Sequence, residues 1–180
     1  RVFRPQIELH VLPPLVSRGA TRRSLAREAR ASMEAVLSGP SPLDVPRRLF
    51  HLYRPVSAFA AGFSRWKTDI DPVFWAAWQR LPREGVILDL GAGEGLLGSY
   101  LRACGSDVTI VGFDIDETRI TRARAVSPAA DVYSVGDART APLPTGVAAV
   151  VALDLLHYLP AADQDALIER MVATLAPGGL

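Results

Sequence analysis

The glycine-rich segment DLGAGEG, residues 89–95, is the part of this sequence best suited to chemistry, and it directly follows the short apolar run at 86–88. Glycine is needed where the backbone takes a positive φ and comes close to a ligand. Beyond Gly95, apolar residues recur at helical spacing, and the start of a helix offers free N–H groups to a ligand. A strand, a glycine turn and a helix are therefore predicted, an arrangement typical of a nucleotide-cofactor site.

Four aspartates stand where predicted strands end, namely Asp89, Asp114, Asp137 and Asp154. Carboxylates gathered at one sheet edge repel each other unless they are exposed, hydrogen-bonded or facing a ligand that carries donors and positive charge. A cofactor with an amino group, ribose hydroxyls and a sulfonium meets that requirement. The carboxylates therefore favour a positively charged nucleoside cofactor.

A dinucleotide site is the alternative, because residues 93–98 satisfy G-x-G-x-x-G and Asp114 follows about 20 residues later. Two features oppose it. With Gly93 as the first glycine, the turn begins two residues late relative to the strand end. In addition, Asp89 and Glu94 place negative charge where a pyrophosphate would bind. An NAD-dependent oxidoreductase stays open as an alternative.

The elements that must position these residues alternate in type along the second half of the chain. Apolar runs and turn signals predict strands at 86–89, 107–113, 132–135 and 146–153. Helices are predicted from Gly95 to near Ala103, at 117–125, and from a cap at Asp163 to Leu175. This order predicts an α/β fold with a doubly wound parallel sheet, whose ligands bind at the carboxyl ends of the strands.

The segment before the first of these strands, residues 41–85, is helical in pattern and rich in aromatic residues. A polar cluster of Arg65, Lys67 and Asp71, with Trp66 among them, precedes Pro72. Aromatic side chains usually fill a core, but a helical layer beside a cofactor site also excludes water from it. Both interpretations stay open.

Composition sets limits on the class of protein. The chain has 180 residues, 49% of them hydrophobic, and a formal net charge of +1, with the basic excess in residues 1–48. It contains no apolar run near the roughly 18 residues of a membrane span, and its first residues do not resemble a signal peptide.

The lone Cys104 cannot form an internal disulfide, which favours the cytoplasm, and its position suits a small buried side chain. Scattered arginines without aromatic interleaving predict no nucleic-acid partner.

Five motifs, in the expected order, resemble those of class I S-adenosylmethionine-dependent methyltransferases: VILDLGAGEG, VGFDID, VGDA, VVALDLLHYL and LAPGGL, within residues 86–180. The resemblance implies that S-adenosylmethionine is the cofactor. It implies that the methionyl part is held by Asp89, Gly91, Ala92, Gly93 and Gly95, the ribose by Asp114 with Ile115, and the adenine by Asp137 with Ala138. Asp154 completes the implied cofactor contacts.

The same resemblance places the methyl acceptor after the fourth strand. Asp154, His157 and Tyr158 follow it and are candidates for orienting or deprotonating an acceptor. Methyl transfer depends mainly on positioning and on exclusion of water, so a dedicated base is not required. The alternative for His157 is a structural role, in which it packs at the start of a helix and forms hydrogen bonds with the backbone. Because DLLH replaces the Asn-Pro-Pro-Tyr signature of amino-group methylation, a small-molecule or lipid-like acceptor is expected rather than DNA. No metal site is predicted.

The leading segment resembles the C-terminal tail of lysophosphatidate-type acyltransferases, through IELHVLPPL and RRSLAREARASMEAVL in residues 1–38. We therefore expect three parts: a strand–helix extension at 1–40, which the resemblance implies is the end of a fused upstream acyltransferase, a helical cap at 41–85, and a cofactor domain at 86–180. Since the methyltransferase sheet continues beyond Leu180 in the family, a truncated domain with an exposed edge and low turnover is expected. A catalytically impaired module that serves a fused acyltransferase is a further alternative.

Overall fold

The computed structural model describes Arg27 and residues 44–180. The strand and helix predicted within residues 1–38 lie outside this range, except that Arg27 itself is helical and exposed. The acyltransferase resemblance therefore stays a prediction.

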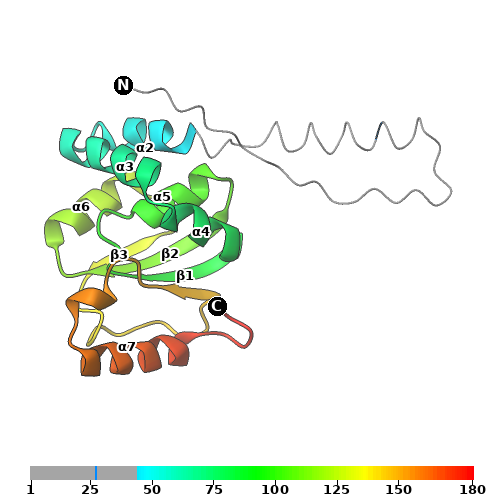
Figure 1. Cartoon of the computed structure of the whole chain (residues 1–180), viewed down its shortest axis with the longest axis vertical. Helices are drawn as coiled ribbons and strands as arrows, with labels where there is room; N and C mark the ends of the chain where they lie inside the picture. Colours follow the sequence, from blue (N-terminus) through cyan, green and yellow to red (C-terminus); the bar gives the residue numbers. More distant parts are fainter. Residues whose placement is uncertain (1–26, 28–43) are drawn as a thin grey trace.

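Four parallel strands form the sheet, in the order β3-β2-β1-β4. They are β1 (Glu84–Leu90), β2 (Asp107–Asp114), β3 (Val132–Val135) and β4 (Ala149–Val151). The order reverses between β1 and β4, so that ligands are expected at the carboxyl ends of the strands near this switch point. The predicted doubly wound parallel sheet is confirmed (Figure 1).

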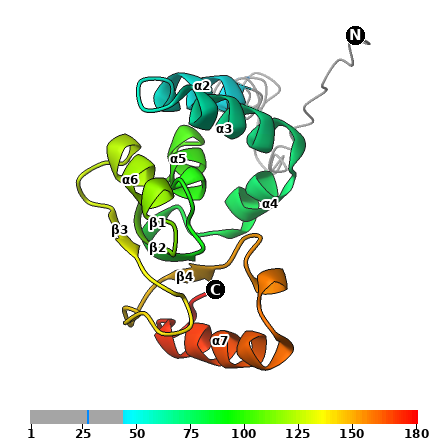
Figure 2. The ribbon, with the colours of Figure 1, turned by 90° about the vertical axis from the view of Figure 1, so that its left-hand side faces the viewer.

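Helices cover both faces of the sheet (Figures 1 and 2). On one side lie α5 (Leu96–Ala103), α6 (Glu117–Val126) and α4 (Val73–Arg80), with α2 (Val45–Tyr53) and α3 (Ala58–Ile70) beyond α5. On the other side lies α7 (Ala161–Thr174), preceded by the short 3-10 helix η2 (Leu156–Tyr158).

The core has two parts because strand side chains alternate between the faces. Ile87, Ile110 and Ala149 are fully buried with the residues of α2 to α6. Leu88, Leu90 and the α7 residue Leu167 are buried on the opposite face. The apolar runs of β1 and β2 are continuous because helices cover both faces of these strands.

Two predicted elements have different bounds. The predicted strand at 146–153 is shorter, since β4 spans only Ala149–Val151. Gly146 turns the chain at φ 74°, and Asp154 bends it away at φ 52°. Between them, the backbone of Ala148 and Val150 pairs with Leu180, so the edge of β4 is partly covered.

The predicted cap of the last helix is also wrong. Pro160 occupies the N-cap position of α7, and Asp163 lies within the first turn. A proline fixes a φ that suits the start of a helix, and an acidic side chain in the first turn interacts favourably with the helix dipole without capping it. The carboxylate of Asp163 is free to bind a residue outside its own helix.

Tyr133 of β3 constrains the glycines beside it. Its ring lies against Gly112 of β2, where an added Cβ atom would stand 2.5 Å from a ring carbon and 2.9 Å from the Cβ atom of Ala92. Tyr133 is itself buried, so the ring has little room to move. The glycine is therefore required for the loop after β1 to approach β2.

We expect Gly112→Ala to destabilise the protein by about 1–3 kcal/mol, the usual cost of overpacking a core. Chemical denaturation followed by circular dichroism measures this. Gly62→Ala on α3 is the matched control, because nothing lies within 4 Å of its added Cβ and alanine favours a helix. A Gly112→Ala variant as stable as the wild type would contradict the packing described.

Candidate functional site

Two cavities adjoin at the carboxyl ends of the strands. The first has a volume of about 650 Å³ and lies between the glycine loop and α3, and the second, about 530 Å³, lies between β2 and the start of α7. Asp89 lines the first, Asp114 and Asp137 line the second, and Asp154 lines both. The four aspartates singled out in the sequence therefore meet at one edge, as predicted.

The glycine loop folds back onto the end of β2. Gly91, Gly93 and Gly95 all have positive φ, at 77°, 53° and 74°. The N–H groups of Gly91 and Ala92 donate to the carbonyl oxygen of Phe113 at 2.8 and 2.9 Å. Gly95 caps α5 in a left-handed conformation. Glycine adopts these positive φ values without strain, whereas a residue with a side chain would be strained there. Such backbone conformations are expected in a loop that lies in close contact with a ligand.

Asp114 is held by backbone donors. Its Oδ2 accepts from the N–H of Gly93 at 2.8 Å, and its Oδ1 accepts from the N–H of Asp116 at 2.9 Å. Asp116 in turn caps α6 by accepting from Thr118 and Arg119. Each carboxylate oxygen keeps a lone pair, so Asp114 can still accept hydrogen bonds from a ligand in the second cavity.

Asp89 is the most buried of the four aspartates, with 3% of its surface exposed. Burial, with the charge of Asp114 as a second cause, raises the pKa of Asp89 to about 7. A positive charge in the first cavity would favour the ionised form and lower this pKa again. The site therefore attracts a cationic group.

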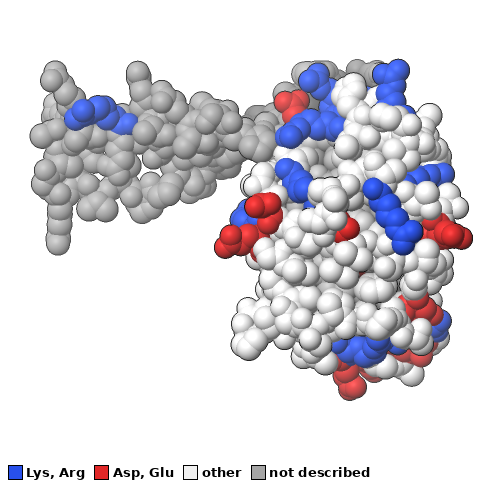
Figure 3. All heavy atoms as spheres, turned by 180° about the vertical axis from the view of Figure 1, so that it is seen from behind, with Lys and Arg blue, Asp and Glu red and all other residues white. Residues whose placement is uncertain are grey.

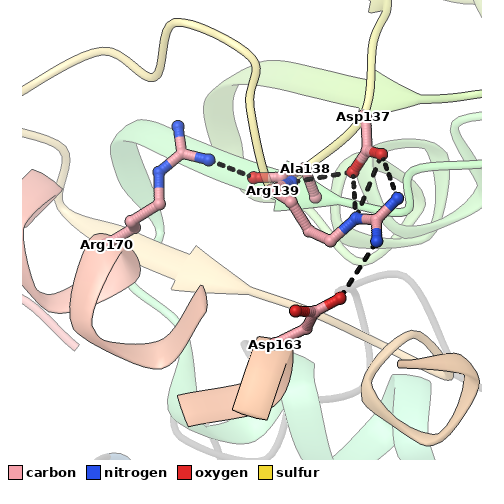
Figure 4. A network of polar contacts seen from close by, with 5 residues as sticks. All are labelled: Asp137, Ala138, Arg139, Asp163 and Arg170. Atoms are coloured by element: carbon pink, nitrogen blue, oxygen red, sulfur yellow. Dashed lines mark hydrogen bonds and ion pairs between the residues drawn. The ribbon is translucent and has the colours of Figure 1, made fainter. Parts of the chain in front are cut away.

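Asp137 binds Arg139 (Figure 4). Nη2 of Arg139 lies 2.6 Å from Oδ2 of Asp137, and the arginine also contacts Asp163 of α7 at 3.0 Å. The side chain and the backbone N–H of Arg139 hold the pKa of Asp137 below its usual range. Arg170 of α7 donates to the carbonyl oxygen of Ala138 at 2.8 Å. Two arginines thus tie the loop after β3 to α7.

Asp154 pairs with Lys67 of α3, whose Nζ lies 2.7 Å from Oδ2 of Asp154 and 2.6 Å from Oδ2 of Asp71. Hydrogen bonds to Asp154 and then to Asp71 raise the pKa of Lys67, which keeps it charged. Asp154 is the one non-glycine residue with positive φ in the part of the chain that is described. Such strain concentrates at functional sites.

The other two acceptor-site candidates differ in their placement. Tyr158 is exposed and lines both cavities. His157 is exposed in η2, with its ring 4.0 Å from that of Tyr158, and is not part of the lining of these two cavities. The structure thus brings Asp154 and Tyr158, but not His157, to the cavity walls.

Several residues at the site were not identified from the sequence. Tyr53 of α2 is buried and donates to the carbonyl oxygen of Glu94 at 2.8 Å, while Arg122 of α6 pairs with the Glu94 carboxylate at 2.7 Å. Because Arg122 compensates Glu94, the charge argument against a pyrophosphate has to rest on Asp89 and its neighbours rather than on Glu94. Oε2 of Glu94 is buried without a partner among the described residues.

Within residues 44–180 and Arg27, no group of three or more His, Cys, Asp and Glu side chains is arranged to hold a metal ion. In the same residues we find no helix with the length and apolar character needed to cross a membrane. On the face shown in Figure 3, basic and acidic side chains are interspersed rather than gathered by sign.

Comparison with known proteins identifies the family. A methyltransferase domain family matches residues 87–179. A chain of the complex between the Haloferax volcanii Trm112 methyltransferase activator and a methyltransferase is 27% identical, with a TM-score of 0.56 over 66% of this chain and 54% of that one. The chain described here thus spans about half the length of that protein. No curated protein sequence matches significantly.

Two further solved structures share the fold. A TehB-like SAM-dependent methyltransferase from Corynebacterium glutamicum is 21% identical, with a TM-score of 0.56 over 71% of this chain and 68% of that one. DhpI in complex with SAH is 18% identical, with a TM-score of 0.57 over 77% of this chain and 67% of that one. The family match covers more than half of the chain and all four strands except the first residues of β1. The chain therefore belongs to the methyltransferase domain family and shares the fold of these solved methyltransferases.

Proposed function

We propose that this protein transfers a methyl group from S-adenosylmethionine to a small-molecule or lipid-like acceptor. The observation that carries the proposal is the row of four carboxylates, Asp89, Asp114, Asp137 and Asp154, along two adjoining cavities next to a glycine loop. A ligand with a sulfonium, an ammonium and ribose hydroxyls complements such an edge.

The residues present fit that cofactor. Glu94 offers a buried oxygen without a partner in the described residues, and the buried Asp89 lines the same first cavity. Both can accept from donors or face positive charge. In our assignment, Asp89, Gly91, Ala92, Gly93 and Gly95 hold the methionyl part in the first cavity.

The second cavity is assigned to the nucleoside. Asp114 accepts from both ribose hydroxyls, a geometry that suits a planar carboxylate. Ile115, which is exposed and lines the cavity, provides apolar contact. Asp137 and the N–H of Ala138 face the adenine edge as acceptor and donor. Arg139 makes four hydrogen bonds to Asp137, two to each oxygen, which use the about four lone-pair positions of a carboxylate. In this assignment the exposed side chain of Arg139 moves away from Asp137 when adenine binds.

The bound cofactor supplies an electrophilic methyl group. The residues of this chain position the acceptor and limit the access of water to the site, with α3 and α4 as a cover over the first cavity through Phe59, Phe63 and Phe74. Asp154 stands where the two cavities meet, so it contacts both the cofactor and the acceptor in this assignment. There it accepts a hydrogen bond, and where needed a proton, from the acceptor. Tyr158 borders the same place, and the ring centroid of His157 lies 4.0 Å from that of Tyr158.

A thermal-shift comparison tests the cofactor and the alternative dinucleotide. We expect S-adenosylmethionine and its demethylated product to raise the melting temperature, and NAD to leave it unchanged, because a ligand stabilises the state that binds it. Calorimetry on the same samples gives the affinities. Stabilisation by NAD alone would overturn the proposal in favour of an oxidoreductase.

The pH dependence of cofactor affinity tests the role of Asp89. Because its pKa is about 7 in the free protein, the carboxylate ionises between pH 6 and pH 8, and affinity for the positive cofactor should rise by up to about tenfold over that range. The Asp89→Asn variant should bind more weakly and lose this part of the rise. Subtracting the pH profile of the Asp89→Asn variant from that of the wild type removes the contribution of other titrating groups to the affinity.

The stability of the free protein should depend on pH in the opposite sense. From about pH 4 to pH 7, folded Asp89 holds a proton that the unfolded chain has released, so its contribution to stability falls as the pH rises, by up to about 1.4 kcal/mol per pH unit. Urea unfolding of the wild type and of Asp89→Asn at several pH values measures the difference. Parallel curves for the two proteins would argue against a raised pKa.

A further inference from the structure

Helix α3 has two separate apolar faces. One is buried against α2 and consists of small residues, including Ala60, Ala61 and Ser64. The other carries three aromatic side chains, Phe59, Phe63 and Trp66, which all line the first cavity. Among the described residues, packing accounts for the first face and for part of Phe63, which lies against the core, whereas Phe59 is 71% exposed and Trp66 is 56% exposed.

These three residues form a continuous aromatic wall. They stand at i, i+4 and i+7, which places them along one side of the helix. The rings of Phe59 and Phe63 are parallel to within 8° with centroids 6.3 Å apart, and Phe63 lies 6.2 Å from Trp66. Large exposed aromatic surface next to a cavity indicates a binding surface, and parallel ring faces suit a flat apolar ligand.

Charges in the lining distinguish between classes of acceptor. Three cationic side chains line the cavity, and each has a carboxylate partner: Lys67 with Asp154, Arg122 with Glu94, and Arg119 with Asp116 at the longer distance of 3.6 Å. Asp89 adds a further carboxylate. A phosphate or carboxylate ligand would find every cation of this lining already paired with a carboxylate, so the lining favours a neutral acceptor.

A polar anchor lies at one border of the first cavity. Asp154 reaches both cavities, and Lys67, from the same helix as the aromatic wall, fixes its Oδ2. Its carboxylate oxygens can accept a hydrogen bond from a ligand O–H that lies against the wall. A flat apolar body and one hydroxyl are thus matched by neighbouring parts of a single cavity.

We propose that the acceptor is a neutral hydroxylated aromatic molecule, held by the wall of Phe59, Phe63 and Trp66, whose hydroxyl donates to Asp154, with Lys67 as the positioning residue. This rests on the proposed function. The acceptor O–H bond breaks as its proton passes to Asp154, the oxygen bonds the methyl carbon, and the electron pair of the broken C–S bond stays with the sulfur. The products are an aryl methyl ether and S-adenosylhomocysteine.

Ligand binding tests the acceptor class without turnover. With the protein saturated by S-adenosylhomocysteine, 2-naphthol is titrated beside two probes of the same skeleton, the anionic 2-naphthyl phosphate and the non-aromatic decahydro-2-naphthol. We expect 2-naphthol to bind at least about tenfold more tightly than either. Equal or tighter binding of the phosphate, or of the saturated alcohol, would overturn the proposal.

Variants locate the binding on the wall. Phe59→Ala and Trp66→Ala should each weaken 2-naphthol binding several-fold while affinity for S-adenosylhomocysteine is unchanged. Ile70→Ala is the matched control, since Ile70 is 57% exposed on the same helix and outside the cavity lining. Unchanged 2-naphthol binding in both aromatic variants would show that the wall is not the subsite.

Lys67 is tested by its effect on Asp154. Lys67→Met should lower kcat for 2-naphthol methylation and shift the acidic limb of the pH profile upward, whereas Lys67→Arg should restore both. Arg65→Gln removes a positive charge from the same helix and serves as control. An unshifted pH profile in Lys67→Met would overturn the positioning role.

The binding measurements distinguish failure of the two proposals. If S-adenosylhomocysteine does not bind the wild type, the proposed function fails. If S-adenosylhomocysteine binds but the protein shows no preference for 2-naphthol, the acceptor inference alone fails.

Discussion

The gathering of negative charge at one sheet edge constrains the rest of the site. Three of the four carboxylates are compensated from within the chain: Asp114 by backbone N–H groups, Asp137 by Arg139 and Asp154 by Lys67. Asp89 is different, because it is buried and the charge of another carboxylate, Asp114, further raises its pKa. Under the proposed function, a positively charged ligand provides the compensation that Asp89 lacks, which couples cofactor binding to the ionisation of Asp89.

The sequence predicted the framework because its signals are local. Apolar runs gave the strands, and the glycine turn followed β1 where expected, since both depend on residues within a few positions. Parallel strands with their carboxyl ends at one edge then brought the aspartates together. The bounds of β4 were missed because the predicted strand at 146–153 included Gly146, which turns the chain, and because its apolar residues do not indicate the bend at Asp154.

The compensating partners were not predictable in the same way. Lys67 lies 87 positions from Asp154, Arg122 lies 28 from Glu94, and Tyr53 lies 41 from the carbonyl it binds. Only the packing of α2 and α3 over α5 and of α6 beside the loop brings these pairs together. A single sequence shows which carboxylates need a partner but not which cation provides it, because many arginines of similar local context compete. Arg139 is the exception, as it lies two positions from Asp137 and the turn itself brings them together.

Helix α3 links the two cavities through this long-range compensation. Its buried face attaches it to α2, and α2 reaches the glycine loop through the hydrogen bond from Tyr53 to Glu94. Its other side carries both the aromatic wall and Lys67, which pairs with Asp154, one of the residues that line both cavities. A movement of α3 would shift the wall and the ammonium group of Lys67 that pairs with Asp154. Under the proposed function, the position of α3 thus affects the distance between the methyl donor and the acceptor, and an in-line transfer depends on that distance.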